Sequence, residues 1–383
     1  MNKRDFLKTS TMAAASVVVQ PMGIFETSST SKEKNGKKAL MLGGRGFIGP
    51  TIVNALLAAG YEVTLLNRGM TNPELFSELP LIVCDREKEN KQGLKAISKK
   101  DRETYWDVVV DTWQKSSKAV ADFLEEFKSN IGHYHYISSI SVYDKWDKKY
   151  IIENEPLNPL PAAPTTIGEE FRYAIRKTLA EEAIRKHFDR YTIYRSSGMK
   201  DYRTTHPNDP SSQPYWPVRF NRGGEILVPK IKDHYIQFTD VQSLVRFVVH
   251  CAENKTYGAF NVAHPTMAFK DYISCLAYVT QRPDKLHWID GSFLEKEGLL
   301  PYKIVPFWRE QPVGFYYFNV QKALLAGLVN RPVTDMLADQ LAGYKSRFPK
   351  DDVRFGITVG DTTIKYFSME KEKEVIRKWI ART

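Results

Sequence analysis

The stretch KKALMLGGRGFIGPTIVNALLAAGYEVTLLNRG, residues 37–69, decides the fold of this chain. Its apolar residues predict a short buried strand at 38–42, a helix at 47–59 and a second strand at 61–67. A strand, a helix and a second strand in this order form a βαβ unit, because parallel strands need a crossover connection of about this length. We therefore expect this stretch to begin a parallel sheet.

Glycines separate the first predicted strand from the helix, at Gly43, Gly46 and Gly49. Glycine suits this place because the turn is tight, the backbone must come close to a pyrophosphate, and the helix must pack closely on the strand. A phosphate would lie on the free amides at the start of the helix. The spacing predicts a dinucleotide-binding loop that also includes Phe47 and Ile48.

The second predicted strand ends in a neutral and a basic residue, Asn67 and Arg68, where NAD-binding units carry an acid. Arg68 can accept a 2′-phosphate, which favours NADP slightly over NAD. Alternatively, Arg68 stacks on the adenine and Asn67 bonds a ribose hydroxyl, and the cofactor is NAD. Asp85 ends the third predicted strand, where it either bonds the adenine amine or caps a helix.

The same alternation continues along the chain. Strands are predicted at 106–113, 133–140 and 191–197, and helices at 117–129 and 168–187. Alternation of this length predicts an α/β fold with a doubly wound parallel sheet, of the Rossmann type, and a smaller C-terminal substrate domain.

Four segments follow from this pattern. Residues 1–36 form a signal and tether, residues 37–200 the dinucleotide-binding domain, residues 201–350 the substrate-binding part, and residues 351–383 a tail with a helix. Residues 235–262 are expected to return to the dinucleotide-binding domain.

A long connection rich in proline, serine and glycine, residues 206–229, follows the last predicted strand. Connections of this length often close over a substrate. Tyr215, Trp216 and Arg219 supply aromatic and cationic groups that suit a polyhydroxylated or acidic ligand. They suit packing of the connection onto the rest of the protein equally well.

Tyr173 and Lys177 lie in one predicted helix, one turn apart on a single face. Ser139 lies in the stretch YISSISVYD, at the carboxyl end of a predicted strand, where parallel sheets place their ligands. A free phenol has a pKa of about 10 and is a poor base at neutral pH, but a neighbouring ammonium favours its ionised form. The pattern is typical of a site for proton transfer.

The order of G-x-x-G-x-x-G, S-S-x-x-V-Y and Y-x-x-x-K resembles that of the short-chain dehydrogenase/reductase superfamily, in its extended, NAD-dependent epimerase/dehydratase-like branch. The resemblance covers roughly residues 37–345. It implies catalysis by Ser139, Tyr173 and Lys177, with Lys177 also holding the nicotinamide ribose. Ser138 and Ser141 are second choices for the catalytic serine. It further implies an NAD(P)-dependent oxidoreductase or epimerase that acts on a sugar or sugar-like alcohol through a transient keto intermediate.

Three positions depart from the family pattern. Serine follows Arg195, where proline is common, and Gln237 stands where nucleotide-sugar enzymes often carry arginine. The residues after Ser139 are Ile140 and Ser141, where the sugar-dehydratase branch supplies an acid. These departures weigh against dehydration and against a UDP- or GDP-sugar substrate.

Two other functions stay open, a non-redox cofactor-binding protein of the same fold (RNA-binding or scaffold) and a net NADP-dependent carbonyl reductase. The net charge of +10 is spread along 383 residues, which favours a solvated basic surface over nucleic-acid binding. We expect a small carbohydrate-like substrate as the partner and no membrane span. The oligomeric state is open, with a homodimer among the possibilities.

Three cysteines, Cys84, Cys251 and Cys275, lie far apart, without a C-x-x-C motif or a histidine cluster. We expect buried thiols, with neither a metal site nor a disulfide framework.

The N-terminal stretch NKRDFLKTSTMAAASVVVQ resembles a twin-arginine export signal in which Lys3 replaces the first arginine. Export to the periplasm is expected, and a cytoplasmic protein with an unstructured tail is the alternative. An exported enzyme meets no nicotinamide pool, so a redox-neutral reaction with a tightly held cofactor is expected.

Overall fold

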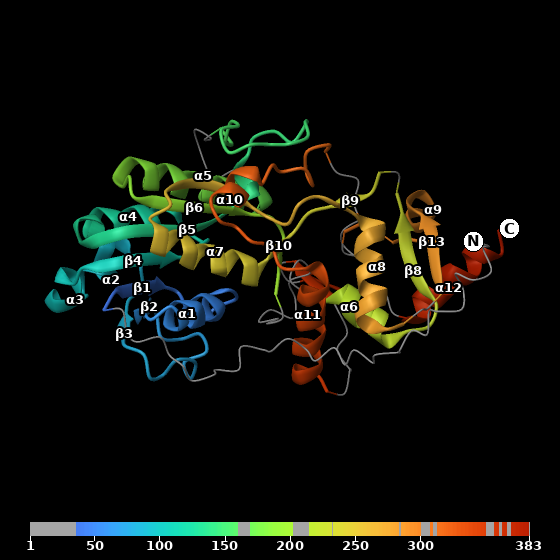
Figure 1. Cartoon of the computed structure of the whole chain (residues 1–383), viewed down its shortest axis with the longest axis horizontal. Coiled ribbons are helices and arrows are strands. Elements are labelled where there is room, and N and C mark those ends of the chain that lie inside the picture. Colours follow the sequence, from blue (N-terminus) through green and yellow to red (C-terminus); the bar gives the residue numbers. More distant parts are fainter. Residues whose placement is uncertain are drawn as a thin grey trace, which may run out of the picture. The chain divides into compact units, whose positions relative to one another are not determined.

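Seven parallel strands form the central sheet of the computed structural model, in the order β11-β6-β5-β4-β1-β2-β3 (Figure 1). The structure describes residues 36–159, 169–201, 214–231, 233–282, 285–299, 307–308, 312–349, 356–359, 362–365 and 369–382. They all lie in the unit Ser31–Thr383. None of the helices in these ranges is both long enough and apolar enough for a membrane span.

The strands of the sheet are short and largely buried, as in other parallel sheets covered on both faces. They are β1 (Lys38–Leu42), β2 (Glu62–Asn67), β3 (Leu81–Val83), β4 (Trp106–Asp111), β5 (Ile131–Ser139), β6 (Tyr191–Ser196) and β11 (Gly258–Val262). The chain runs outward from β1 in one direction through β2 and β3, and then in the other through β4, β5, β6 and β11. The predicted doubly wound sheet is confirmed.

Helices cover both faces of the sheet, because successive side chains of a strand point to opposite faces. On β1, Ala39 and Met41 pack with α1 (Gly49–Ala58) and α7 (Val241–Asn254). Leu40 and Leu42 enter the core on the other face, which contains residues of α4 (Ser117–Phe127) and α5 (Glu169–His187). The strand order reverses between β1 and β4, which is the place where such sheets bind ligands.

Short helices connect these elements. They are η1 (Glu89–Lys91), α2 (Gln92–Lys95), α3 (Lys99–Glu103), η2 (Lys128–Asn130) and η3 (Ile140–Val142).

A second region, built around another core, follows β6. Its elements are β7 (Met199–Lys200), α6 (Tyr215–Arg222), β8 (Ile226–Lys230), β9 (Tyr235–Ile236), β10 (Thr239–Asp240), β12 (Met267–Ala268), α8 (Phe269–Thr280), β13 (Leu286–Asp290), α9 (Gly291–Lys296), α10 (Gln321–Leu325), α11 (Val333–Arg347), β14 (Gly356–Val359), β15 (Thr362–Lys365) and α12 (Met369–Ile380). β11 leaves this succession and pairs with β6 in the central sheet, and α10 packs beside it.

The core of the second region contains many aromatic side chains among its aliphatic ones. Trp216, Phe220, Phe238, Tyr272 and Trp308 are among its fully buried members. Helices α6, α8 and α11 pack on one another, while β8 pairs with β13 and contacts α9 and α12 (Figure 1).

Candidate functional site

The glycine loop connects β1 to α1 in a turn that side chains would obstruct. Gly43 has a φ of 110°, and a Cβ on it would stand 2.8 Å from Thr112 Oγ1. A Cβ on Gly49 would stand 2.7 Å from the backbone of Gly44, so the helix approaches the turn closely. Gly46 faces open space, which leaves room for a ligand beside its backbone.

The start of α1 suits an anion. Ile48 occupies the N-cap position without a side-chain hydrogen bond, so no side chain caps the first turn in the described structure. The amides at such a helix start carry partial positive charge and seek an acceptor. Phe47 is half-buried and Ile48 is buried, and both side chains pack on the core that lies on the α1 face of the sheet. The predicted loop residues therefore fit a dinucleotide pyrophosphate.

The two residues that end β2 and follow it have different roles. Asn67 Nδ2 donates to the Gly43 carbonyl at 3.0 Å, and Asn67 Oδ1 accepts from the Gly69 amide at 2.7 Å. Its side chain therefore ties β2 to the glycine loop. Arg68 is exposed beside this tie.

Asp85 lies after β3 and is half-buried. Its Oδ1 accepts from the Glu87 amide at 3.1 Å, so the carboxylate stabilises the turn that follows the strand. This bond resembles the capping alternative, and a contact with adenine stays a prediction.

Lys177 is buried on α5, one turn after Tyr173, with 2% of its surface exposed. Its Nζ donates to the carbonyls of Ile137 at 2.7 Å and Trp113 at 3.0 Å, and to the Tyr136 hydroxyl at 3.1 Å. The Nζ also lies 4.5 Å from the ring centroid of Tyr136 and 6.0 Å from that of Tyr173. The predicted pair is thus brought to the carboxyl end of β5, because Ile137 belongs to that strand.

Burial lowers the pKa of Lys177 to about 7. The carboxylates of Asp111 and Glu181 act in the opposite direction and favour the ammonium. Three hydrogen-bond acceptors around an amine also favour its charged form. The lysine is therefore a buried amine that gains and loses its proton near neutral pH, beside the predicted acid–base tyrosine.

Three serines compete for the catalytic position after β5. Ser138 is buried, and its Oγ donates its proton to Glu181 at 2.6 Å. This hydroxyl therefore stabilises the fold and has no proton left to donate to a substrate. Ser139 ends β5, and its Oγ accepts from the Ser141 amide at 3.2 Å, which caps η3. The Oγ of Ser141 is buried without a hydrogen-bond partner in the described structure. Because η3 packs on α5, Ser139 and Ser141 lie on the segment that faces the Tyr173 helix.

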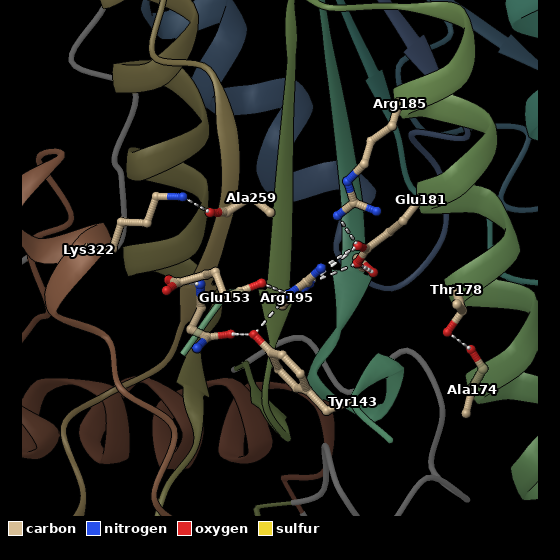
Figure 2. A network of polar contacts seen from close by, with 11 residues as sticks. Tyr143, Glu153, Ala174, Thr178, Glu181, Arg185, Arg195, Ala259 and Lys322 are labelled. Atoms are coloured by element: carbon tan, nitrogen blue, oxygen red, sulfur yellow. Dashed lines mark hydrogen bonds and ion pairs between the residues drawn. The ribbon is translucent and has the colours of Figure 1, made fainter. Parts of the chain in front are cut away.

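Arg195 and Glu181 form a buried ion pair that fixes these elements (Figure 2). Arg195 Nη2 donates to Glu181 Oε2 at 2.8 Å, and its Nη1 donates to the Tyr143 hydroxyl at 3.0 Å. Tyr143 in turn donates to Asn261 on β11 at 2.5 Å. Burial would raise the pKa of Glu181, but the hydrogen bonds and charge of Arg195 hold it below its usual value. The network joins α5, the end of η3, β6 and β11.

A second buried pair lies at the carboxyl end of β4, and no motif predicted it. Arg86 donates both Nη atoms to Asp111, at 2.8 and 2.9 Å, and the Tyr134 hydroxyl donates to the same carboxylate at 2.6 Å. Burial would raise the pKa of Asp111, but the charge of Arg86 holds it below its usual value. One signal in the sequence could have identified Asp111 as a candidate site residue. It ends a central parallel strand, where such sheets bind their ligands.

Residues 39–263, more than half of the chain, match the model of the epimerase family described as the NAD dependent epimerase/dehydratase family. The chain belongs to this family. The predicted resemblance is confirmed, and with it an enzyme of the extended short-chain dehydrogenase/reductase type and NAD dependence at the level of the family.

Solved structures of the same fold include a candidate epimerase from Burkholderia cenocepacia, at 17% identity and a TM-score of 0.60, covering 82% of this chain and 99% of that one. UDP-glucuronic acid 4-epimerase from Bacillus cereus in complex with NAD has 17% identity and a TM-score of 0.54, with 82% and 98% covered. UDP-glucose 4-epimerase from Thermotoga maritima with UDP-glucose has 16% identity and a TM-score of 0.57, with 82% and 100% covered. At these identities the likeness concerns the fold. No curated protein matches the sequence.

Three residues of the connection 206–229, for which substrate contacts or packing were expected, contribute to packing. Tyr215 and Trp216 are buried in the core of the second region. Arg219 Nε donates to Glu372 on α12 at 2.7 Å, and its Nη atoms donate to the carbonyls of Gly223 and Glu225. These contacts correspond to the packing alternative, and substrate binding by the three residues stays a prediction.

Gln237 is also occupied within the protein. Its Nε2 donates to the carbonyls of His264 and Phe318, and its Oε1 accepts from the Phe318 amide at 2.9 Å. The residue that departs from the nucleotide-sugar pattern therefore ties chain segments together.

The cysteines are free thiols. Cys84 and Cys251 are buried, and burial raises the pKa of Cys84 to about 11. Cys275 is half-buried and packs against the core of the second region, so the expectation of a buried thiol is only partly met at this residue. The described residues contain no group of histidine, cysteine and acidic side chains arranged for a metal ion.

Proposed function

We propose that this protein is an NAD(P)-dependent epimerase that acts on a sugar or sugar-like alcohol through a transient keto intermediate. The observation that carries the proposal is the place of Tyr173, one helical turn before the buried ammonium of Lys177, at the carboxyl end of β5. Membership of the epimerase/dehydratase family supports it. The names of the similar solved structures support an epimerase and a carbohydrate substrate.

The glycine loop, the start of α1 and Lys177 would hold the dinucleotide. Open space at Gly46 and the uncapped first turn of α1 favour a pyrophosphate there. NADP is favoured slightly over NAD, because the exposed Arg68 follows β2 where a carboxylate would serve NAD. When bound, the nicotinamide would supply hydride transfer to and from the substrate carbon.

Tyr173 exchanges the proton of the substrate hydroxyl. The Lys177 ammonium favours the phenolate of Tyr173 by charge, so the tyrosine can accept the proton near neutral pH. Ser139 donates a hydrogen bond to the substrate oxygen and fixes its direction. When the carbonyl is reduced again, Tyr173 gives the proton back.

A redox-neutral cycle is the form of this chemistry that needs no exchange of cofactor. It suits an exported enzyme, and export stays a proposal, since residues 1–35 with the twin-arginine-like stretch lie outside the described residues. We expect the cofactor to be held tightly and to remain with the protein through purification.

Replacing Tyr173 by phenylalanine tests the assignment. We expect turnover to fall at least about a hundredfold, the scale of losing a general acid–base group, with cofactor affinity unchanged. Tyr278→Phe is the matched control, since Tyr278 is 61% exposed on α8. Unchanged turnover of the Tyr173 variant would remove the tyrosine from the mechanism.

A second experiment separates epimerisation from net oxidation. The protein is purified without added nucleotide, its bound cofactor is measured by absorbance and mass spectrometry, and UDP-sugars and free sugars are offered with none supplied. Formation of an epimer under these conditions supports the proposal. Empty protein that consumes one NADP⁺ for each product formed would indicate a dehydrogenase.

A further inference from the structure

An open cavity of about 350 Å³ lies on the α5 face of the central sheet, beside its edge strand β11. Side chains of α5, β6 and α10 line it, together with the segment that follows η3. Its volume is at the lower end of the range of sites for small ligands, about 300 to 1,000 Å³. None of its described lining residues is one that we expect to hold the dinucleotide or to transfer a proton.

The cavity is separate from the predicted catalytic site. The glycine loop follows β1, and β11 lies four positions from β1 in the sheet, roughly 19 Å at a strand spacing of about 4.8 Å. Arg185 lies eight residues after Lys177 on α5, which is about 12 Å along the helix. Because α5 runs back from the carboxyl ends of the parallel strands, Arg185 lies toward their amino ends, where Tyr191 begins β6.

The charged side chains at the cavity leave one positive charge unmatched. Arg195 and Arg185 share one carboxylate, since their Nη2 atoms lie 2.8 and 2.7 Å from Glu181 Oε2 (Figure 2). Lys322 forms no ion pair among the described residues, and its Nζ donates to a backbone carbonyl of β11 at 2.8 Å. Only two carboxylates, those of Glu181 and Glu153, stand against these three cations in the described structure.

Several groups at the cavity retain hydrogen-bonding capacity for a ligand. A guanidinium has five N–H donors and an ammonium three, and the bonds described for Arg185 and Lys322 use one donor each. Glu153 Oε1 accepts from the Asn261 amide at 2.8 Å, which holds this carboxylate at the cavity and leaves its second oxygen as an acceptor among the described residues. Asn154 is exposed beside it, and its amide both donates and accepts.

The wall between these groups is fixed within the protein. Arg195 is 1% exposed, and its Nη1 donates to the Glu153 carbonyl at 2.8 Å and to the Tyr143 hydroxyl at 3.0 Å. The backbone that carries Glu153 and Asn154 is therefore held against β6. Groups that are already in place lose less conformational freedom when a ligand binds.

The chemistry of these groups favours a hydroxylated carboxylate. A guanidinium matches the two oxygens of a carboxylate, and an ammonium adds a further donor. A carboxylate carries the one negative charge that balances the cavity, whereas a phosphate monoester carries about 1.5 to 2 at pH 7. Glu153 and Asn154 suit hydroxyl groups of the same ligand, and the half-buried ring of Tyr191 suits an apolar face of it.

We infer that this cavity binds a small hydroxylated carboxylate, of the class of sugar acids, at a site separate from the catalytic one. Arg185 and Lys322 bind the carboxylate, and Glu153 and Asn154 bind hydroxyl groups. The inference does not rest on the proposed function, since none of these four residues takes part in hydride or proton transfer.

Binding of three related probes to the full chain tests this. D-Glucuronate, D-glucose 6-phosphate and D-glucose share one ring and differ in the group at carbon 6, and calorimetry at low salt measures each affinity. We expect the wild type to bind glucuronate at least about tenfold more tightly than glucose, the scale of hydrogen bonds to a charged group. Arg185→Gln and Lys322→Gln should each weaken glucuronate binding about tenfold and change glucose binding less than about twofold.

Matched variants make the result specific. Lys186→Gln removes an exposed cation next to Arg185 that does not line the cavity, and it should leave every affinity unchanged. Lys322 is exposed, so Lys322→Gln keeps the test valid if Arg185→Gln fails to fold.

Three results would overturn the inference: no binding of glucuronate, equal affinities for glucuronate and glucose, or glucuronate binding that survives both substitutions. Tighter binding of glucose 6-phosphate, lost in the same variants, would overturn the assignment to a carboxylate. Each of these results leaves the proposed function standing, because turnover of the Tyr173→Phe variant tests that function independently.

Discussion

The β6–α5 region and the glycine loop each contain a buried arginine, and the two arginines differ in their hydrogen-bond partners. Arg195 is 1% exposed, and its Nε and Nη2 donate to Glu181 while Nη1 donates to Tyr143 and the Glu153 carbonyl (Figure 2). Arg45 is 5% exposed, and among the described residues its side chain makes only the long contact to the Phe76 carbonyl. The first arginine completes the fold, whereas the second has capacity left for an anion.

The other buried arginines in the described residues follow the first pattern. Arg86 pairs with Asp111 at 2.8 Å, and Arg219 pairs with Glu372 at 2.7 Å. Among the described residues, the buried arginines are therefore paired with carboxylates, except for the one in the glycine loop. The exception marks a binding site more clearly than the burial does.

The largest effect is expected when the matched arginine loses its partner. Glu181→Gln leaves the Arg195 charge buried without a carboxylate, which should lower the free energy of unfolding by about 3 to 5 kcal/mol in urea denaturation. Replacing both residues, Glu181→Leu with Arg195→Met, should recover most of this loss, because no charge then remains buried.

Glu182→Gln is the control for this prediction, since Glu182 is the exposed neighbour of Glu181 on α5. It should change stability by less than about 0.5 kcal/mol. If the Glu181 variant were as stable as this control, the pair would not be structural and the contrast with Arg45 would disappear.

A smaller effect is expected from the buried histidines. They carry no buried charge, because they lose their proton when the chain folds. Burial, assisted by the charge of Arg190, lowers the pKa of His133 to about 3, and burial also lowers that of His135. Below pH 6.5 the unfolded chain therefore binds protons that the folded chain does not bind. The contribution of these histidines to the free energy of unfolding is fully present above pH 6.5 and falls as the pH drops toward 3. Between pH 7.0 and 5.5, His133 should account for about 1 kcal/mol.

Unfolding in urea at several pH values checks this prediction. His133→Gln cannot titrate, so its stability should fall less steeply with acid than that of the wild type. The same slope in both proteins would mean that His133 is protonated in the folded state.

The smallest effect is expected at Arg45 itself. Without nucleotide, Arg45→Met should leave the free energy of unfolding unchanged within about 1 kcal/mol or raise it, because it removes a buried charge and keeps an unbranched apolar stem. Urea denaturation of nucleotide-free protein measures this. A loss of several kcal/mol would place Arg45 with Arg195 as a structural residue.

Local pattern was enough to predict the sheet. The residues of β1 alternate between the two cores, and the helices that follow have apolar spacing, so the βαβ unit could be found from residues 37–69 alone. Boundaries shifted slightly, since α1 begins at Gly49 rather than 47 because Phe47 and Ile48 belong to the turn. The place of Tyr173 and Lys177 on one helix was equally visible.

Pairings between distant residues could not be predicted. Arg86 meets Asp111 across 25 positions, and Arg219 meets Glu372 across 153. The aromatic and cationic residues at 215–219 looked suited to a ligand because nothing near them in sequence shows that the second region builds its core from aromatic rings. Likewise, Arg45 can be read from the sequence, but only the structure shows that its side chain is buried and that its Nε has no hydrogen-bond partner among the described residues.

The contact between Arg219 and Glu372 has a consequence for synthesis of the chain. A ribosome that adds about 5 to 20 residues per second needs roughly 8 to 30 seconds to cover the 153 positions between them. During that interval, closing the second region around α6 would bury a cation with no acid to meet it. The nascent chain must therefore leave this region open until the residues of α12 have emerged, while β1 to β6 are already available for pairing.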